Sequence, residues 1–258
     1  MTVFKLPLRI GTRRSPLARV QAQMVHDQLC ATHGSLAAEG AIEVVFIQTT
    51  GDIVQDRPLA DIGGKGLFTK EIDSALVNGH IDVAVHSMKD VPTVLPIGLT
   101  ISCVLPREDP RDALISSSGV NFAELPPGAL IGTASLRRRA QILARRPDLV
   151  VESLRGNVNT RLKKLDSGVV DATILAFAGL KRLGQDHLVT EILSPETMLP
   201  AAAQGAIGVE CRRADDQIIS LLMPLNHSST EIAVCAERAL LAQLDGSCET
   251  PIAALCTL

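Results

Sequence analysis

The feature that most constrains the fold is a regular alternation of short apolar runs with segments of helical periodicity. Runs such as residues 42–47 and 172–176 have the length and the aliphatic content of buried strands. Between such runs lie stretches such as residues 16–29, whose apolar positions recur every three or four residues. Strands that alternate with helices predict parallel sheets covered by helices, so we expect an α/β fold.

The alternation predicts a set of elements along most of the chain. The first helix has a clear start signal, because Ser15 is a good N-cap and Pro16 suits the first helical position. Strands are expected at residues 8–10, 42–47, 81–85, 130–131, 149–154, 172–176 and 206–209. Helices are expected at residues 16–29, 67–77, from 135 onward, at 158–165 and at 231–244.

Two segments interrupt the alternation and divide the chain. Residues 105–111 (LPREDPR) and 199–205 (LPAAAQG) have the composition of crossovers between two α/β lobes with a cleft between them. We expect a first lobe from residues 1–105 and 206–223, and a second lobe from residues 106–199. Residues 226–258 are expected to form part of a small third α+β domain.

Charge is distributed unevenly along the chain. The whole protein has a net charge of -3, yet residues 137–182 contain eleven Lys and Arg against four acidic residues. A cationic segment in a nearly neutral protein predicts one anionic partner at one place. Nucleic acid is disfavoured as that partner, because aromatic residues make up only 2% of the chain and stacking on bases needs aromatic faces.

The N-terminus and the cysteines indicate a cytoplasmic protein without a metal centre. The first fifteen residues carry four cations and no long apolar run, so we expect neither a signal peptide nor a membrane span. The six cysteines form no C-x-x-C pair, and an H-E-x-x-H motif is absent. Zinc and iron–sulfur sites are therefore not expected, and the thiols should be free in a reducing compartment.

Hydroxyl and cationic side chains follow five of the predicted strands, at the points where the strands end. Ligands of open α/β sheets bind there, near helix N-termini, so these side chains should form one binding surface. Guanidinium groups grip carboxylates with paired hydrogen bonds, so the ligand should carry several anionic groups. The residues are Thr12, Arg13 and Ser15; His86, Ser87, Lys89 and Asp90; Thr133, Ser135, Arg137 and Arg138; Arg155, Asn157 and Arg161; and Lys181 and Arg182.

Two of the reactive residues admit more than one interpretation from the sequence. Asp90 could be a turn aspartate, or a carboxylate that faces a cationic intermediate or transfers a proton. Cys248 follows Gly246 and Ser247 on a predicted loop, where a reagent could reach its thiol. His86 is interpreted as a hydrogen-bonded structural histidine. The residues alone leave the roles of Asp90 and Cys248 open.

Six motifs in register closely resemble the porphobilinogen deaminase (hydroxymethylbilane synthase) family, over residues 8–253. They are residues 86–92 (HSMKDVP), 132–138 (GTASLRR), 153–161 (SLRGNVNTR), 178–182 (AGLKR), 199–205 (LPAAAQG) and 246–252 (GSCETPI). The resemblance implies two lobes like those of periplasmic binding proteins, with hinge crossovers. It also implies a third domain, of which this chain would contain a fragment, since ten residues follow Cys248.

The resemblance implies a transferase of porphyrin and heme biosynthesis. Members of the family condense four porphobilinogen molecules head to tail, with loss of ammonia at each step, and hydrolysis then releases the linear tetrapyrrole. The product grows on one dipyrromethane cofactor per chain, held by a thioether to a cysteine. A cytoplasmic monomer is expected, with porphobilinogen as its partner and without metal, nucleic acid or membrane.

The resemblance also assigns roles to individual residues. Cys248 matches the cofactor cysteine, and Asp90 matches the catalytic aspartate that contacts pyrrole nitrogens. The residues that match cofactor-binding positions are Ser87, Lys89, Asp90, Thr133, Ser135, Arg137, Arg138 and Arg155. Those that match substrate-binding positions are Arg13, Ser15, Arg155, Arg161 and Arg182. The sequence departs from the family pattern at Ser247, where a glycine is usual, and in residues 49–52 (TTGD), which lack a common arginine.

The implied chemistry agrees with the charge pattern. Each pyrrole carries an acetate and a propionate, so a growing chain needs many arginines around it. Loss of ammonia leaves a cationic azafulvene-like species, and a nearby carboxylate lowers the cost of that charge in a partly dry site. Two rival functions remain from the sequence: a non-enzymatic two-lobed binder of an anionic small molecule, and an RNA-binding protein.

Overall fold

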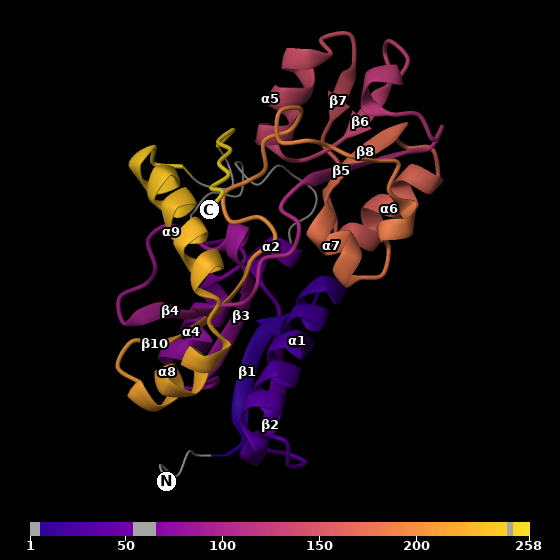
Figure 1. Cartoon of the computed structure of the whole chain (residues 1–258). Coiled ribbons are helices and arrows are strands. Elements are labelled where there is room, and N and C mark those ends of the chain that lie inside the picture. Colours follow the sequence, from indigo (N-terminus) through magenta and orange to yellow (C-terminus); the bar gives the residue numbers. More distant parts are fainter. Residues whose placement is uncertain (1–5, 54–65, 247–249) are drawn as a thin grey trace.

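The structure is a computed structural model that describes residues 6–53, 66–246 and 250–258. The described residues form two five-stranded mixed sheets, each at the centre of one lobe (Figure 1). We call the sheet with the order β2-β1-β3-β10-β4, together with the helices that cover it, lobe 1. The sheet with the order β7-β6-β8-β5-β9 and its helices form lobe 2. The bounds of these elements follow. The predicted α/β class with two sheets is confirmed.

Lobe 1 combines the N-terminal part of the chain with one strand from much later in the sequence. β1 pairs in parallel with β2 and β3, whereas β10 runs antiparallel between β3 and β4. The strands are β1 (Leu8–Arg13), β2 (Ile42–Ile47), β3 (Val83–Ser87), β4 (Leu99–Val104) and β10 (Ile207–Arg212). The helices are α1 (Pro16–Thr32), α2 (Thr50–Ile53), α4 (Lys70–Val77) and α8 (Asp216–Leu222).

Lobe 2 is built from one continuous stretch of chain, residues 112–192. β6 pairs in parallel with β7 and β8, and β5 runs antiparallel between β8 and β9. The strands are β5 (Asp112–Ser116), β6 (Leu130–Gly132), β7 (Val150–Glu152), β8 (Ala172–Ala176) and β9 (Glu191–Ile192). The helices are α5 (Leu136–Arg145), α6 (Val158–Asp166) and α7 (Phe177–Arg182).

Each lobe has its own apolar core, made mainly of aliphatic side chains. In lobe 1, Val25 and Leu29 of α1 are fully buried against the sheet. In lobe 2, Ile131, Ile142 and Ile174 are fully buried together. A separate core lets each lobe hold the ends of its own strands in fixed positions.

Two crossovers connect the lobes, and they contact each other. The first crossover (residues 105–111) joins β4 to β5, and the second (residues 193–206) joins β9 to β10. The backbone N–H of Glu108 donates to the carbonyl oxygen of Gly205 at 3.2 Å. Gly205 has a φ of 91°, and a Cβ there would lie 2.3 Å from the carbonyl oxygen of Glu108. Glycine is therefore required for this close approach.

A further helix, α9 (Ser228–Gln243), lies beside lobe 1 (Figure 1). Its Glu237 side chain is buried and accepts hydrogen bonds from both Nη atoms of Arg107, at 2.6 and 3.0 Å. Glu237 also accepts the backbone N–H of Ala203 at 2.5 Å. Because Arg107 belongs to the first crossover and Ala203 to the second, this one carboxylate ties α9 to both.

The predicted and observed elements differ in two ways: predicted elements have shifted ends, and β4, β5, β9, α2, α7 and α8 were not predicted. β3 begins two residues later than predicted and α4 three residues later, since residues 66–69 form a turn. β5 was not predicted, because the charged residue Asp112 starts it and hides its apolar pattern. Lys181 and Arg182, expected in a loop after a strand, lie in the last turn of α7. Among the described helices, none combines the length and the apolar content that crossing a membrane requires.

Candidate active site

A cavity of about 530 Å³ lies between the two lobes. Its wall is formed by the ends of β1, β3 and β8, by the first turns of α1, α5 and α6, and by the second crossover. The structure thus brings together strand ends that are far apart in the sequence. The predicted site residues that line the cavity are Arg13, Ser15, Ser87, Lys89, Asp90, Ser135, Arg137, Arg138, Arg155 and Arg161.

Five residues of the predicted site do not belong to the described cavity wall. Thr12 is fully buried, and Lys181 pairs with Glu108 at 2.7 Å. Thr133 is buried behind the wall, where its hydroxyl accepts the backbone N–H of Ser135 at 3.2 Å. Arg182 donates to the carbonyl oxygen of Gly205 at 2.6 Å, so its guanidinium faces the second crossover. Cys248, the predicted cofactor cysteine, lies outside the described residues, and its role stays a prediction.

Three helices begin at the cavity with polar N-caps. The Ser15 hydroxyl accepts the N–H of Ala18 at 3.4 Å at the start of α1, and the Ser135 hydroxyl accepts the N–H of Arg138 at 3.4 Å at the start of α5. Asn157 caps α6 in the same way. Helix N-termini carry unpaired N–H groups and a partial positive charge, so this side of the cavity favours anions even before the arginines are counted.

Asp90 lies in the turn that follows β3, with 27% of its side chain exposed. Arg13 is placed between Asp90 and a second carboxylate, Asp52. Its Nη1 is 3.5 Å from Oδ2 of Asp90, and its Nε donates to Oδ2 of Asp52 at 3.2 Å. The same guanidinium lies 4.2 Å from the centre of the Phe68 ring, a cation–π contact. Burial would raise the pKa of Asp52, but Arg13 holds it below its ordinary value.

Positive charges crowd the wall of the cavity. Burial lowers the pKa of Lys89 to about 8; Asp90 opposes the shift and Arg138 adds to it. Burial also lowers the pKa of Arg161 to about 10, with contributions from Arg138 and Arg155. Cations that lower one another's pKa repel one another, and a bound anion relieves that repulsion. The donor set therefore fits a ligand with several carboxylates.

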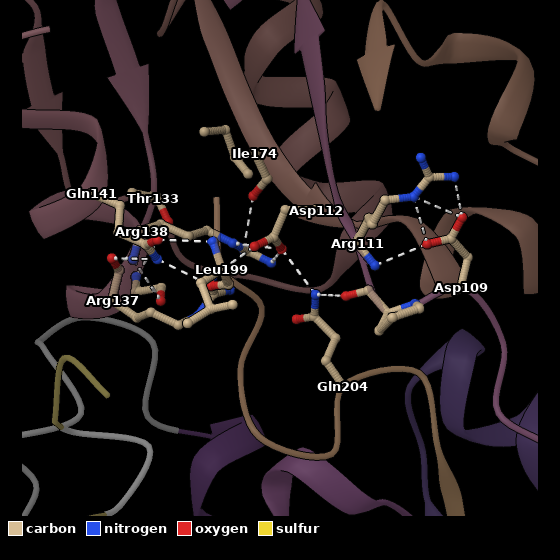
Figure 2. Close-up of polar contacts among 12 residues, drawn as sticks. Asp109, Arg111, Asp112, Thr133, Arg137, Arg138, Gln141, Ile174, Leu199 and Gln204 are labelled. Carbon is tan, nitrogen blue, oxygen red and sulfur yellow. Dashed lines mark hydrogen bonds and ion pairs between the residues drawn. The ribbon is translucent and has the colours of Figure 1, made fainter. Parts of the chain in front are cut away.

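Figure 2 shows how Arg137 and Arg138 are held in place. Both donate to the fully buried carboxylate of Asp112, Arg137 through Nη1 at 2.7 Å and Arg138 through Nη2 at 2.7 Å. Each also donates to a backbone oxygen, Arg137 to Leu199 and Arg138 to Ile174. Burial would raise the pKa of Asp112, but the two guanidiniums bring it to about 2.

Sequence reasoning missed several polar residues of the site. Gln21 exchanges hydrogen bonds with the Ser87 hydroxyl at 2.8 and 3.1 Å, and Asp52 fixes Arg13. Asp112 could have been found, because residues 112–116 (DALIS) place an acid in an otherwise apolar strand. A carboxylate is buried in such a place only with a cationic partner, and the arginine pair is the obvious one.

A second group of buried charged side chains lies in lobe 1. His86 on β3 has its Nε2 3.0 Å from Oε2 of Glu210 on β10, and Asp73 of α4 completes the group. Their ligand-type atoms lie within 4.8 Å of one another, so among the described residues this group could hold a divalent cation. Burial and the charge of Glu210 raise the pKa of Asp73 to about 6. One oxygen each of Glu210 and Asp73 is buried with no hydrogen-bond partner in the described chain.

The fold and the cavity define a class: two-lobed α/β proteins with a cavity between their lobes. A periplasmic substrate-binding protein of an ABC transporter from Coxiella burnetii shares this architecture with a TM-score of 0.50 and 13% identity. The likeness covers 90% of this chain and 96% of that one, and it concerns the fold alone.

Comparison of sequences identifies the family. The family model "Porphobilinogen deaminase, dipyromethane cofactor binding domain" matches residues 8–220. Porphobilinogen deaminase, chloroplastic, from Pisum sativum is 61% identical over 247 residues, which are 95% of this chain and 67% of that protein. Porphobilinogen deaminase from Paracoccus denitrificans is 58% identical over 252 residues, 98% of this chain and 80% of that protein. The chain belongs to the porphobilinogen deaminase family, as its motifs predicted.

Proposed function

We propose that this chain catalyses the stepwise deaminating condensation of four porphobilinogen molecules and the hydrolytic release of the linear tetrapyrrole. The observation that supports the proposal most directly is the cavity itself. It brings two partly exposed carboxylates, Asp90 and the Asp52 that pairs with Arg13, together with cations and helix N-termini from both lobes. The protein is a transferase of porphyrin and heme biosynthesis.

The cations of the cavity hold the carboxylates of the substrate. Every condensation adds one acetate and one propionate, so the demand for positive charge grows with the product. Arg13, Arg155, Arg161 and Ser15 line the cavity and are proposed to bind substrate carboxylates. Arg182 is proposed to do the same from beside the second crossover, where it donates to the carbonyl oxygen of Gly205.

The dipyrromethane cofactor of the family supplies, when bound, a covalently held primer to which new pyrrole units are joined. Cys248 is proposed to carry it, one per chain. The crowded positive charge around Lys89 and Arg138 fits its carboxylates. Ser87, Lys89, Ser135, Arg137, Arg138 and Arg155 line the cavity and are proposed to hold it, with Thr133 behind them.

Asp90 is proposed to act at the reacting atoms. Its carboxylate can accept hydrogen bonds from pyrrole N–H groups and can stabilise the positive charge that develops as the substrate loses ammonia. Arg13, fixed by Asp52, lies beside Asp90 and restricts where its oxygens point. One aspartate serves all four condensations if the growing chain moves past it, and the two crossovers are the place where the lobes would shift.

The domain division and the setting of the protein are proposals of the same kind. The two sheets support a first lobe of residues 1–105 and 206–223 and a second of residues 106–199. Residues 226–258 are proposed to belong to a third domain that carries Cys248. We propose a monomer that acts in the cytoplasm without a metal, although the pea relative is named chloroplastic.

Intact-mass analysis of the purified protein tests the proposal. We expect an added mass of two linked pyrrole units, absent from Cys248→Ser and kept in Cys235→Ser, a control at an exposed cysteine of α9. A non-enzymatic binder of anions would instead show an exchangeable ligand and no adduct. Unmodified protein that also fails to consume porphobilinogen would refute the proposal.

Substitution of Asp90 tests its role in turnover. Asp90→Ala should fold and keep the adduct but lose turnover by roughly 10²- to 10⁴-fold, the range of a group that assists at the reacting atoms. Asp166→Ala, at the exposed end of α6, is the matched control and should leave turnover unchanged. Near-normal turnover of Asp90→Ala would remove Asp90 from the mechanism.

A further inference from the structure

Asp112 is a buried carboxylate on which several parts of the site converge. It is the first residue of β5, directly after the first crossover, and its side chain is fully buried. Its Oδ2 accepts Nη1 of Arg137 at 2.7 Å. Its Oδ1 accepts Nη2 and Nε of Arg138 at 2.7 and 3.1 Å, and Nε2 of Gln204 at 3.0 Å. Every one of these donors belongs to a residue that lines the cavity.

The two arginines depend on Asp112 for their orientation. They are consecutive residues in the first turn of α5, so their side chains leave the helix about 100° apart. Asp112 nevertheless brings both guanidiniums to one carboxylate, and they are only 4% and 5% exposed. Without that carboxylate the two guanidiniums would repel each other, and each would keep only its bond to a backbone oxygen, Arg137 to Leu199 and Arg138 to Ile174.

The same carboxylate connects the arginines to both crossovers (Figure 2). Gln204, in the second crossover, donates through its Nε2 to the carbonyl oxygen of Pro110, in the first crossover, at 2.7 Å as well as to Asp112. Arg137 reaches the second crossover directly through the carbonyl oxygen of Leu199 at 2.7 Å. The position of the guanidiniums and the path of the crossovers are therefore fixed by one hydrogen-bond network.

We infer that Asp112 is a positioning residue of this active site. It holds the guanidiniums of Arg137 and Arg138 at the cavity wall, where they meet ligand carboxylates, and through Gln204 it fixes them to the crossovers between the lobes. The inference rests on the proposed function, because it takes the ligand to be a pyrrole that carries carboxylates.

Charge and position predict opposite effects for the loss of the Asp112 charge. Asp112 neutralises one of the two guanidiniums, so a neutral residue at this position makes the cavity more positive by one charge. If charge alone mattered, an anionic ligand would then bind more tightly. If Asp112 acts by positioning, the ligand binds more weakly although the cavity has become more cationic.

Asp112→Asn separates these two effects, because it keeps the side-chain shape and one acceptor oxygen. Because Arg137 and Arg138 are proposed to hold the cofactor, we expect the fraction of chains that carry the pyrrole adduct to fall in intact-mass analysis. In the chains that carry it, we expect the KM for porphobilinogen to rise roughly 10- to 100-fold, as for the loss of one charge-assisted hydrogen bond, with a much smaller change in kcat. Asp109→Asn is the matched control: it removes a carboxylate of the same crossover that pairs with Arg111 and does not line the cavity. It should leave both constants unchanged.

A measurement of ligand binding that needs no turnover tests the role of Asp112 separately from the proposed function. Calorimetry with a pyrrole that bears acetate and propionate but no aminomethyl group reports carboxylate binding directly. Wild-type protein that binds this probe but neither carries an adduct nor consumes porphobilinogen refutes the proposed function alone. Tighter or unchanged binding by Asp112→Asn, with the wild-type protein binding normally, overturns the role of Asp112.

A double-mutant cycle decides whether Asp112 acts through the arginines. If Asp112→Asn weakens binding by misplacing Arg137, then adding it to Arg137→Gln should cost at most about twofold more, since coupled residues are not additive. Fully additive losses of affinity would mean that Asp112 only supports the fold. Should Asp112→Asn fail to fold, Gln204→Met keeps the carboxylate and removes the hydrogen bonds from Gln204 to Asp112 and Pro110, while the bond from Arg137 to Leu199 remains. It should raise the KM severalfold, and an unchanged KM would then overturn the inference.

Discussion

Two of the buried charge clusters among the described residues, those around Asp112 and around Glu210, have opposite compositions. In lobe 2, Asp112 faces two arginines, so one carboxylate is outnumbered by cations. In lobe 1, Glu210 and Asp73 face His86, so the carboxylates outnumber the one group that can carry positive charge. The pKa values follow: burial would raise both, but the pKa of Asp112 falls to about 2, whereas that of Asp73 rises to about 6.

The difference shows two ways of using a buried carboxylate near one cavity. The lobe 2 cluster satisfies both Asp112 oxygens and leaves one surplus positive charge, so it is suited to orient groups that bind anions. The lobe 1 cluster leaves a buried oxygen of Glu210 and one of Asp73 without partners in the described chain. Its surplus negative charge calls for a proton or another cation, so its contribution to stability should depend on pH.

The largest effect is expected from Asp112→Ala, which removes the partner of two buried guanidiniums. Breaking a buried ion pair from one side leaves uncompensated charge, so we expect a loss of about 3–5 kcal/mol in the free energy of unfolding. Urea denaturation at neutral pH measures this loss. A loss below 1 kcal/mol would show that water reaches Arg137 and Arg138 and that the cluster is not the rigid unit described above.

A smaller change in the free energy of unfolding is expected at Asp73. Its contribution to stability falls as the pH rises, whereas that of Asp112 falls as the pH is lowered. The folded-state pKa of Asp73 lies above the ordinary value of 3.8, so its contribution is favourable below about pH 4 and is lost as the pH rises through about 6. Asp73→Asn should remove this loss, worth at most about 3 kcal/mol, and flatten the stability curve between pH 4 and 6. Urea denaturation across this pH range gives the slope of unfolding free energy against pH for the wild-type protein and for Asp73→Asn.

Asp112 supplies the internal comparison for that experiment. Its pKa is depressed, so its contribution is fully present above about pH 4 and is lost as the pH falls through about 2. Asp73→Asn should leave this acid limb of the curve unchanged. If Asp73→Asn flattened the curve of stability against pH equally near pH 2 and between pH 4 and 6, the two clusters would be coupled.

Gln204→Met should have a moderate effect. It removes the donor to Pro110 and to Asp112, but the arginines still satisfy Asp112, so we expect a loss of about 1 kcal/mol in unfolding free energy. Methionine also removes the Gln204 Oε1 atom, which is buried without a partner in the described chain. A loss of unfolding free energy as large as that of Asp112→Ala would show that Gln204, rather than Asp112, has the main structural role in this network.

The smallest effect is expected at Asp109, which lies in the first crossover beside the partly exposed Arg111. Asp109 pairs with Arg111, whose side chain is 40% exposed, and exposed ion pairs contribute little. Asp109→Ala should therefore change the unfolding free energy by less than about 1 kcal/mol. Thermal denaturation of Asp109→Ala and Asp112→Ala under the same conditions tests whether the loss of stability depends on the burial of the ion pair rather than on the number of ion pairs removed.

The sequence predicted the fold well where local signals were strong. Residues 42–47 and 172–176 were predicted as strands with the observed bounds, and Ser15 with Pro16 marked the start of α1. Six elements were not predicted: β4, β5, β9, α2, α7 and α8. A charged first residue hides the periodicity of β5, and α2, α7 and β9 are too short to show one. Tertiary contacts, which no local pattern contains, decide such elements.

The candidate site was predicted only in part, because local patterns show where strands end but not which side chains meet in the folded chain. Strand ends identified the cavity wall from Arg13 to Arg161, since topology places such ends together. The partner of Arg13 could not be predicted, because Asp52 meets it only in the folded chain, whereas the acid in residues 112–116 could have indicated the pairing of Asp112 with the arginines. Arg182 shows the converse: its motif matched, yet the fold turns it toward the crossover.

The position of β10 has a consequence for synthesis on the ribosome. β10 lies inside the sheet of lobe 1, between β3 and β4, although it comes after the whole of lobe 2 in the sequence. A nascent chain can therefore complete the sheet of lobe 2 while lobe 1 still lacks an internal strand, with the edges of β3 and β4 unpaired. The lobe that begins first is completed last, so a ribosome that stalls between the two crossovers exposes an unfinished sheet.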